Sequence, residues 1–188
     1  MENYAVRLTA KIESLTAQAR EALAKVTIVR HFERGEHMLS PGEVCRGSYW
    51  IQRGIARKYY VNDDREVTTE FFFDDDLAIS LQSYALQTAG TEYIQALTPL
   101  VVQFTPYPAF QELKIRHPEL LELDLMMTEY YAMWLEERLF QFHTMDATER
   151  YAWLLNREPH VVQQIALTHI ASYLGVSLET LSRIRARR

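Results

Sequence analysis

The residues best placed to do chemistry lie at the C-terminal end of the 188-residue chain. Residues 167–188 predict two short helices, with Thr168 capping the first, Gly175 forming the turn and Ser177 capping the second. Glu179 and Arg183 then face outward on the second helix. Arginine donates two hydrogen bonds to guanine and glutamate accepts one from cytosine. The spacing predicts a helix-turn-helix that reads bases in the major groove of DNA.

A shared core and an exposed polar face support this interpretation. The apolar side chains Ile170, Ala171, Leu174, Val176, Leu181 and Ile184 fall where two steeply crossed helices would pack together. The side chains expected to contact DNA are Thr168, His169, Ser177, Glu179, Thr180, Ser182, Arg183, Arg185 and Arg187, with Arg188 adding charge. A helical hairpin with a solvated basic tail is the alternative that local pattern alone leaves open.

Net charge separates this segment from the rest of the chain. The whole sequence has 20 Lys+Arg and 25 Asp+Glu, a net charge of −5, which argues against a protein that coats nucleic acid. Residues 159–188 hold four Arg and one Glu, a local charge of +3, so the remainder sums to −8. An acidic body would repel DNA everywhere except at the predicted reading helices.

The elements that must position these helices differ between the two halves of the chain. Five of the six glycines precede residue 91, and β-branched and aromatic runs lie between them. This pattern predicts an antiparallel roll, with strands over 27–32, 37–39, 48–53, 55–61, 66–73, 93–96 and 100–104. Short helices are expected over 77–87 and 108–116.

Helical periodicity dominates the remaining segments. Residues 8–26 predict one amphipathic helix covering the strands, and residues 118–143 predict a long helix that is apolar on two faces. The second face needs either the interior of a single core or a second copy of the chain. Asp146, with Glu149 three residues later, predicts a capping box that starts a helix over 147–156.

Four segments carry a family resemblance: residues 32–43, 49–55, 70–76 and 169–185. Together they resemble a Crp/Fnr-type transcription regulator, in particular a short branch common in Bacteroidetes-like bacteria. The resemblance implies an α+β fold with an N-terminal antiparallel β-roll of jelly-roll, cyclic-nucleotide-binding type. A long dimerisation helix and a C-terminal helix-turn-helix without a full wing would follow. The implied domains are 1–116, 117–144 and 145–188.

The resemblance also implies partners. The chain would act as a homodimer on double-stranded DNA with a palindromic operator, with RNA polymerase and an unknown small-molecule effector as further partners. The implied dimer stripe is Leu123, Met127, Tyr130 and Trp134.

Departures from the family pattern argue against cyclic AMP. Nucleotide-binding members carry a Gly-Glu pair for the ribose and an Arg-Ser pair for the phosphate, and neither pair is present in residues 75–80 or 89–93. Acidic residues at 74–76 and Glu92 would repel a phosphate. The candidate effector pocket is instead apolar in part: Phe71, Phe73, Leu77, Ser80, Thr91 and Tyr93. In the reading helix, Leu178 stands where many relatives carry a second arginine.

Other functional classes find little support in the sequence. The single cysteine, Cys45, excludes an internal disulfide and an iron–sulfur cluster. Only His31, Glu33 and His37 approach a cupin-like metal set, and phosphate loops and nucleophile elbows are missing, so we expect no catalytic residue, metal or cofactor. A β-roll that binds a ligand or partner without DNA is the principal alternative. Lacking a signal peptide or an apolar span, the protein is expected in the cytoplasm, away from membranes.

Overall fold

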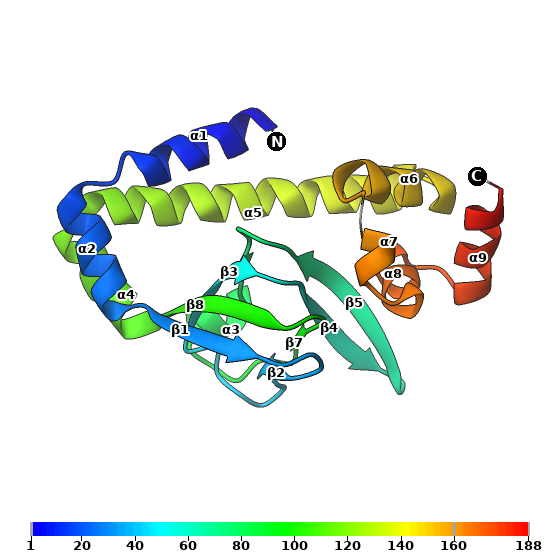
Figure 1. Cartoon of the computed structure of the whole chain (residues 1–188), viewed down its shortest axis with the longest axis horizontal. Coiled ribbons are helices and arrows are strands. Elements are labelled where there is room, and N and C mark those ends of the chain that lie inside the picture. The colour runs from blue at the N-terminus through cyan, green and yellow to red at the C-terminus, as the bar shows by residue number, and fades with distance from the viewer. Residues whose placement is uncertain (1, 160, 188) are drawn as a thin grey trace. The chain divides into compact units, whose positions relative to one another are not determined.

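The computed structural model describes residues 2–159 and 161–187, which form two compact units (Figure 1). The first unit comprises residues up to 27 and 105–145. Its helices are α1 (Glu2–Glu13), α2 (Ala17–Val26), α4 (Tyr107–Arg116) and α5 (Pro118–Thr144). The core side chains of this unit are Leu15, Ala19, Leu113, Leu120 and Leu123. The long helix is confirmed almost to the residue.

The prediction of one continuous N-terminal helix is wrong, because the chain forms two helices there. The Thr16 side chain accepts a hydrogen bond from the Ala19 N–H at 3.1 Å and caps α2, so the chain turns between α1 and α2. The two helices pack on α5 and α4 respectively. Their apolar stripes therefore pack against other helices of the first unit.

The second unit, residues 28–104 with 146 onward, contains the β-roll. Its strands are β1 (Ile28–Phe32), β2 (His37–Leu39), β3 (Gly47–Arg53), β4 (Ala56–Asn62), β5 (Arg65–Phe72), β6 (Leu77–Ala78), β7 (Tyr93–Ala96) and β8 (Leu100–Pro106). They form two four-stranded sheets ordered β1-β8-β3-β6 and β2-β7-β4-β5. The expected antiparallel roll is confirmed. The segment 77–87 differs from expectation, since β6 precedes the short helix α3 (Leu81–Leu86).

Strand β5 is an edge strand, and a tight hairpin sets its register. Asn62 pairs with Arg65, and the two residues between them, Asp63 and Asp64, have φ of 48° and 61°. Aspartate tolerates this left-handed region, and a two-residue turn of this kind matches the twist of a hairpin. One side of β5 pairs with β4, which leaves the other side without a strand partner.

Four helices complete the second unit: α6 (Ala147–Arg157), α7 (Val161–Gln164), α8 (Leu167–Leu174) and α9 (Leu178–Ala186). The predicted capping box is confirmed, because Asp146 Oδ1 accepts from the Thr148 and Glu149 N–H groups at 2.7 and 2.9 Å. Glu149 Oε2 accepts in turn from the Asp146 N–H at 2.8 Å. Helix α7 had no counterpart in the prediction. Among the described residues, no helix combines the length and apolarity needed to cross a membrane.

Candidate nucleic-acid interface

Helices α8 and α9 form the expected helix-turn-helix. Gly175 ends α8 with φ 68°, and its N–H donates to the Ser172 carbonyl at 3.0 Å. The Ser177 side chain accepts from the Thr180 N–H at 3.2 Å and caps α9. Both features confirm the prediction. Thr168 is not a cap, however: α8 begins one residue earlier, with Ala166 as its N-cap residue and no side-chain hydrogen bond.

The predicted core of the helix pair is confirmed, and it extends further than the sequence indicated. Ile170, Ala171, Leu174, Leu181 and Ile184 are buried in one cluster, with Val176 packed against it. The same cluster includes residues from α6, α7 and the β-roll: Tyr151, Leu154, Val161, Ile165, Ile55 and Phe71. The Arg150 Nε also donates to the Leu174 carbonyl at 3.1 Å, which joins α6 to the end of α8.

The polar face of α9 is open to solvent. Glu179, Ser182, Arg183 and Arg185 are exposed, and the Arg183 Nη2 donates to the Thr180 hydroxyl at 3.1 Å. Hydrogen bonds from the backbone of Glu179 and from the Ser177 side chain lower the pKa of the Glu179 carboxyl, so this group is an ionised acceptor at neutral pH. The face therefore carries an acceptor and a bidentate donor one helical turn apart.

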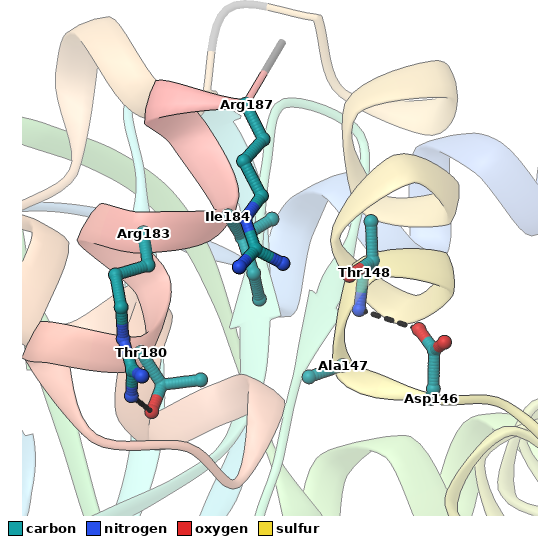
Figure 2. Close-up of a pocket in the computed structure, with 7 residues that line it drawn as sticks. All are labelled: Asp146, Ala147, Thr148, Thr180, Arg183, Ile184 and Arg187. Carbon is teal, nitrogen blue, oxygen red and sulfur yellow. Dashed lines mark hydrogen bonds between the residues drawn. The ribbon is translucent and has the colours of Figure 1, made fainter.

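A pocket of about 300 Å³ lies between α9 and the start of α6 (Figure 2). Thr180, Arg183, Ile184 and Arg187 line it from α9, and Thr148, Ala147 and Asp146 from the other side. Arg183 and Arg187 bring positive charge to one side of the pocket, and the Asp146 carboxylate, which accepts the first N–H groups of α6, brings negative charge to the other. The arginine side suits a negatively charged group that approaches α9 from solvent.

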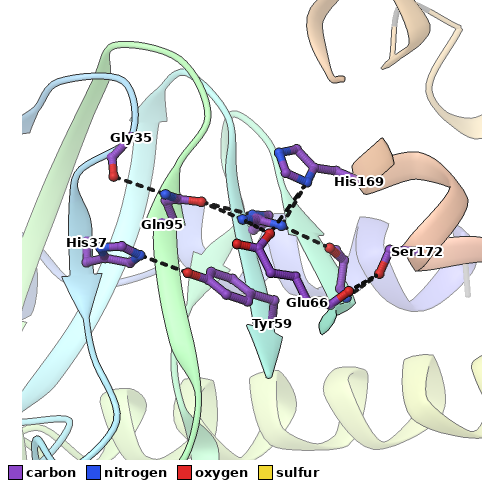
Figure 3. A network of polar contacts seen from close by, with 9 residues as sticks. Gly35, His37, Tyr59, Glu66, Gln95, His169 and Ser172 are labelled. Atoms are coloured by element: carbon purple, nitrogen blue, oxygen red, sulfur yellow. Dashed lines mark hydrogen bonds and ion pairs between the residues drawn. The ribbon is translucent and has the colours of Figure 1, made fainter. Parts of the chain in front are cut away.

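His169 and Thr168 do not share one environment. Thr168 is exposed, whereas His169 is half-buried and its Nδ1 accepts a hydrogen bond from the Arg57 Nη1 at 2.8 Å (Figure 3). Burial, followed by the charges of Arg57 and Arg34, lowers the pKa of His169, while Glu66 at 4.0 Å opposes the shift. His169 is therefore neutral at pH 7 and faces the β-roll. The predicted residue Arg188 lies outside the described residues.

Sequence reasoning missed the residues that receive α8 on the β-roll. Arg57, Glu66 and Thr68 bind His169 and Ser172 of α8. The signal available was a pair of cations, Arg57 and Lys58, inside a strand of otherwise apolar and aromatic residues, because charges in such strands are buried with partners.

The four residues of the predicted dimer stripe do not lie on one open face. Leu123 is only 7% exposed in the core of the first unit, and Met127 packs against that core. Tyr130 and Trp134 are half-buried, and Trp134 stacks on Tyr131 with ring centroids 5.6 Å apart. Leu123 and Met127 thus contact their own chain, because α1 and α2 cover this side of α5. The exposed large apolar side chains described on α5 are Leu121, Leu125, Leu135, Leu139, Phe140 and Phe142.

The six residues of the candidate effector pocket lie in several different environments. Phe71 and Phe73 pack in the cluster that contains the helix-turn-helix, and the Phe71 ring lies 4.9 Å from that of Tyr173. Tyr93 stacks on Tyr59 at 4.6 Å between β7 and β4. Leu77 is half-buried in β6, and Thr91 is exposed. The aromatic residues therefore pack against other parts of the protein, contrary to the expected pocket lining.

The position expected to hold a nucleotide phosphate contains an internal polar network. Buried Ser80 donates to Glu92 Oε2, and the Tyr60 hydroxyl donates to Glu92 Oε1 at 2.8 Å. Nearby, the buried Lys58 forms an ion pair with Glu70 at 2.5 Å. The lone buried thiol, Cys45, has a pKa raised by burial. This interior is acidic, and its cation already has a partner.

The part of the chain that the structure describes shows no arrangement of side chains suited to bind a metal ion. No group of three or more His, Cys, Asp and Glu side chains there could hold an ion. His37, from the proposed cupin-like set, instead hydrogen bonds through Nε2 to the Tyr59 hydroxyl at 2.9 Å.

Comparison with known proteins gives a clear result at the level of structure. No protein-family model matches the sequence, and no curated protein matches it either. Among solved structures, FixK2 from Bradyrhizobium japonicum matches with a TM-score of 0.76 and 18% identity, over 86% of this chain and 84% of that one. The chain has the fold of the Crp/Fnr regulators.

Two further solved structures agree with this fold. The c-di-GMP-responsive global regulator CLP of Xanthomonas campestris matches with a TM-score of 0.72 and 16% identity, over 92% of this chain and 91% of that one. A candidate transcriptional regulator of the Crp/Fnr family from Eubacterium rectale matches with a TM-score of 0.68 and 20% identity, over 92% and 82%. In both comparisons the Crp/Fnr regulator fold extends over 92% of the chain.

Proposed function

We propose that this protein is a homodimeric transcription regulator that binds DNA in a sequence-specific manner through α9. The observation that carries the proposal is the exposed face of this capped helix, which presents Glu179 and Arg183 to solvent while the opposite face is buried. A helix of this kind fits the major groove, where its N-terminal half reaches base edges. The Crp/Fnr regulator fold supports the same function. DNA binding would place the protein in the cytoplasm, and RNA polymerase would be a partner at promoters.

Base reading would combine polar and apolar contacts. Arg183 would donate to guanine O6 and N7, and Glu179 would accept from the amino group of cytosine. Leu178, at the start of α9, is 43% exposed, and an exposed leucine there suits the methyl group of thymine. Replacing a contacted thymine by uracil in the operator would then weaken binding of the wild-type chain and leave a Leu178→Ala variant unaffected.

Phosphate contacts would come from the arginines around the reading face of α9, which is the exposed face that carries Glu179 and Arg183. Arg187 lines the pocket at the start of α6, and Arg185 is exposed on the same helix. Each arginine–phosphate contact displaces counterions, so affinity should fall steeply with salt concentration. Because His169 is neutral and bound to Arg57, it contributes no charge to this interface.

The dimer would form through the open stripe of α5. The positions Leu121, Leu125, Thr128, Ala132, Leu135, Leu139 and Phe142 are all exposed. They are spaced alternately by four and three residues, the repeat that brings two helices together in a coiled coil. Pairing here would bury leucine and phenylalanine side chains that face water in the single chain. The dimer would present two α9 helices to successive major grooves, about 34 Å apart, on a palindromic operator.

The β-roll would not bind cyclic AMP tightly. Glu92 belongs to one of the two segments expected to hold the phosphate and is bonded to Ser80 and Tyr60, so an added phosphate would meet a second negative charge there. Titration calorimetry with cyclic AMP should show no binding, and an affinity in the micromolar range or tighter would contradict this part of the proposal. An effector, if one acts on this protein, has a different chemistry.

Genomic footprinting of the purified protein, followed by mobility shifts on the recovered operator, tests DNA binding directly. Arg183→Ala should lose about 1–3 kcal/mol per half-site on the operator and discriminate less against changes at the contacted base pair. Arg116→Ala removes an equally charged and exposed side chain from α4 and should bind like the wild type. Equal weakening of Arg183→Ala on all DNA sequences would instead assign Arg183 to a phosphate.

The second candidate function is a β-roll that binds a ligand or partner without DNA. The observation that favours this alternative is the network of polar side chains around Glu92 inside the β-roll. Failure of the wild-type protein to bind any genomic fragment at low salt would favour this alternative.

A further inference from the structure

The free edge of strand β5 is covered by helix α8. The Thr68 N–H donates to the Ser172 hydroxyl at 2.9 Å, and that hydroxyl donates to the Glu66 carbonyl at 2.8 Å. An edge strand presents N–H and C=O groups that require partners when they are buried. A single serine of the helix-turn-helix thus satisfies both groups, in the place of a neighbouring strand.

Arg57 links the same two elements by charge. Its side chain is only 2% exposed, and its Nη2 forms an ion pair with Glu66 at 2.6 Å. Its Nε and Nη2 donate to Gln95, and its Nη1 donates to His169 of α8 at 2.8 Å (Figure 3). A buried guanidinium is costly unless every donor is used. Undocking α8 would remove one of these acceptors and hydrate the others.

Apolar packing accompanies the polar bonds. Phe71 of β5 lies against Tyr173 of α8, and Ile55 belongs to the same buried cluster as Ile170 and Leu174. The contact therefore combines a satisfied strand edge, a buried charge and a hydrophobic core. We call the five polar residues that form it the docking contact: Arg57, Glu66, Thr68, His169 and Ser172.

The docking contact leaves the reading face free. All five of its residues lie on β4, β5 or α8, whereas Glu179 and Arg183 lie on α9, Arg187 directly follows it, and all three are exposed. The reading helix can therefore meet DNA while α8 stays docked. An arrangement that blocked DNA would be expected to cover part of α9.

We propose that the docking contact holds the helix-turn-helix against the β-roll in the orientation that reads DNA, with Arg57 and Ser172 as positioning residues. This inference rests on the proposed function. Neither residue touches DNA; each limits the orientations available to α8 and, through the shared core, to α9. In a dimer, docking on both chains limits the movement of each reading helix relative to its own β-roll.

Loss of the docking contact should weaken binding to the second half-site of the operator more than binding to the first. A loosely held helix-turn-helix still binds one half-site, because its own reading face is intact. Binding the second half-site then becomes an intramolecular step whose effective concentration drops when the two heads move freely. Affinity for a palindromic operator should therefore decrease more than affinity for a duplex with a single half-site.

Ser172→Ala tests the proposal, and Ser172→Thr is the variant that retains a hydroxyl. Ser14→Ala is a matched control in the first unit, because this serine donates a hydrogen bond to the end of its own helix. Binding of each protein would be measured on a palindromic operator and on a single half-site. Thermal unfolding would establish that the variants are folded. Hydrogen exchange of the Thr68 amide would report whether α8 is docked, since this N–H donates to Ser172.

In Ser172→Ala we expect faster exchange at Thr68, a loss of about tenfold or more on the palindrome, and a change below about twofold on the half-site. Ser172→Thr should restore most of the palindrome affinity. If Ser172→Ala does not remain folded, Glu66→Gln weakens the same contact from an exposed strand position and should give the same pattern. Unchanged or tighter binding to the palindrome would overturn the inference. If the wild type binds neither duplex, the proposed function itself fails, a result that is distinct from equal binding by the wild type and the variants.

Discussion

Replacing Asp76 by asparagine should stabilise the folded chain at pH 8 and leave it nearly unchanged at pH 4. Asp76 lies in the turn after β5, where its Oδ2 accepts a hydrogen bond from the Phe73 N–H at 2.8 Å. Burial raises the pKa of this carboxyl from 3.8 to about 6, although the bond from Phe73 and the charge of Arg157 both lower it. The ionised form is thus held in an unfavourable environment.

The sign and size of the effect follow from proton linkage. The folded state binds the Asp76 proton more tightly than the unfolded chain, so folding is destabilised as pH rises from about 4 to above 6. A shift of about two pKa units corresponds to about 3 kcal/mol at high pH. An asparagine stays neutral and still accepts the bond from Phe73. Since Asp76 retains some solvent contact, we expect a gain of about 1–3 kcal/mol at pH 8.

Urea unfolding followed by tryptophan fluorescence at pH 4, 6 and 8 would measure this gain at one fixed protein concentration. Asp75→Asn is the matched control, because Asp75 is the exposed neighbour and asparagine tolerates its φ of 68°. The control should differ from the wild type by less than about 0.5 kcal/mol at every pH. A gain for Asp76→Asn that is absent at pH 8, or equal at pH 4 and pH 8, would refute the reasoning.

Three further outcomes are expected. Gly54→Ala should destabilise the β-roll by about 1–3 kcal/mol in thermal or urea unfolding, because Gly54 has φ +109° and a Cβ there would lie 2.5 Å from the Pro99 carbonyl oxygen; wild-type stability would show that the turn can rearrange. Leu125→Glu should convert the proposed dimer to monomers in analytical ultracentrifugation, whereas Leu86→Glu, at a similarly exposed position on α3, should not; a dimeric Leu125→Glu protein would place the interface elsewhere. Lowering the pH from about 7.5 to about 5.5 should weaken docking of α8, since the pKa of His169 is lowered in the fold and a protonated imidazole cannot accept the bond from Arg57. The protection factor of the Thr68 amide measures that docking, and His169→Gln should abolish its pH dependence.

Local patterns predicted the parts of this protein whose structure depends on neighbouring residues. The capping box at Asp146, the left-handed turn at Gly175 and the cap at Ser177 are each set by a few adjacent residues, and all three are confirmed. The seven strands that were predicted lie within two residues of their observed ends for the same reason, since alternation and turn residues act over short distances, whereas the two-residue strand β6 was missed. Thr168 shows the limit of this approach: helix α8 starts at Leu167, where no side-chain cap marks its beginning.

The tertiary structure decided which faces meet. Periodicity revealed two apolar stripes on the long helix but gave no way to tell which stripe is covered by α1 and α2, so Leu123 was assigned to the wrong neighbour. Phe71 was expected in a ligand pocket but packs in the cluster that contains the helix-turn-helix. The sequence of an aromatic strand does not indicate which part of the protein packs against it.

The reading face of α9 is thus a property of the sequence, since its cap, spacing and charge all lie within a few turns of helix. The docking of that helix-turn-helix on the β-roll is a property of the tertiary structure alone. Arg57 and His169 are 112 residues apart, and Thr68 and Ser172 are 104 apart. Hydrogen bonds across such separations form only after the sheet has fixed its edge and buried its charge, and a single sequence contains no local signal of that pairing.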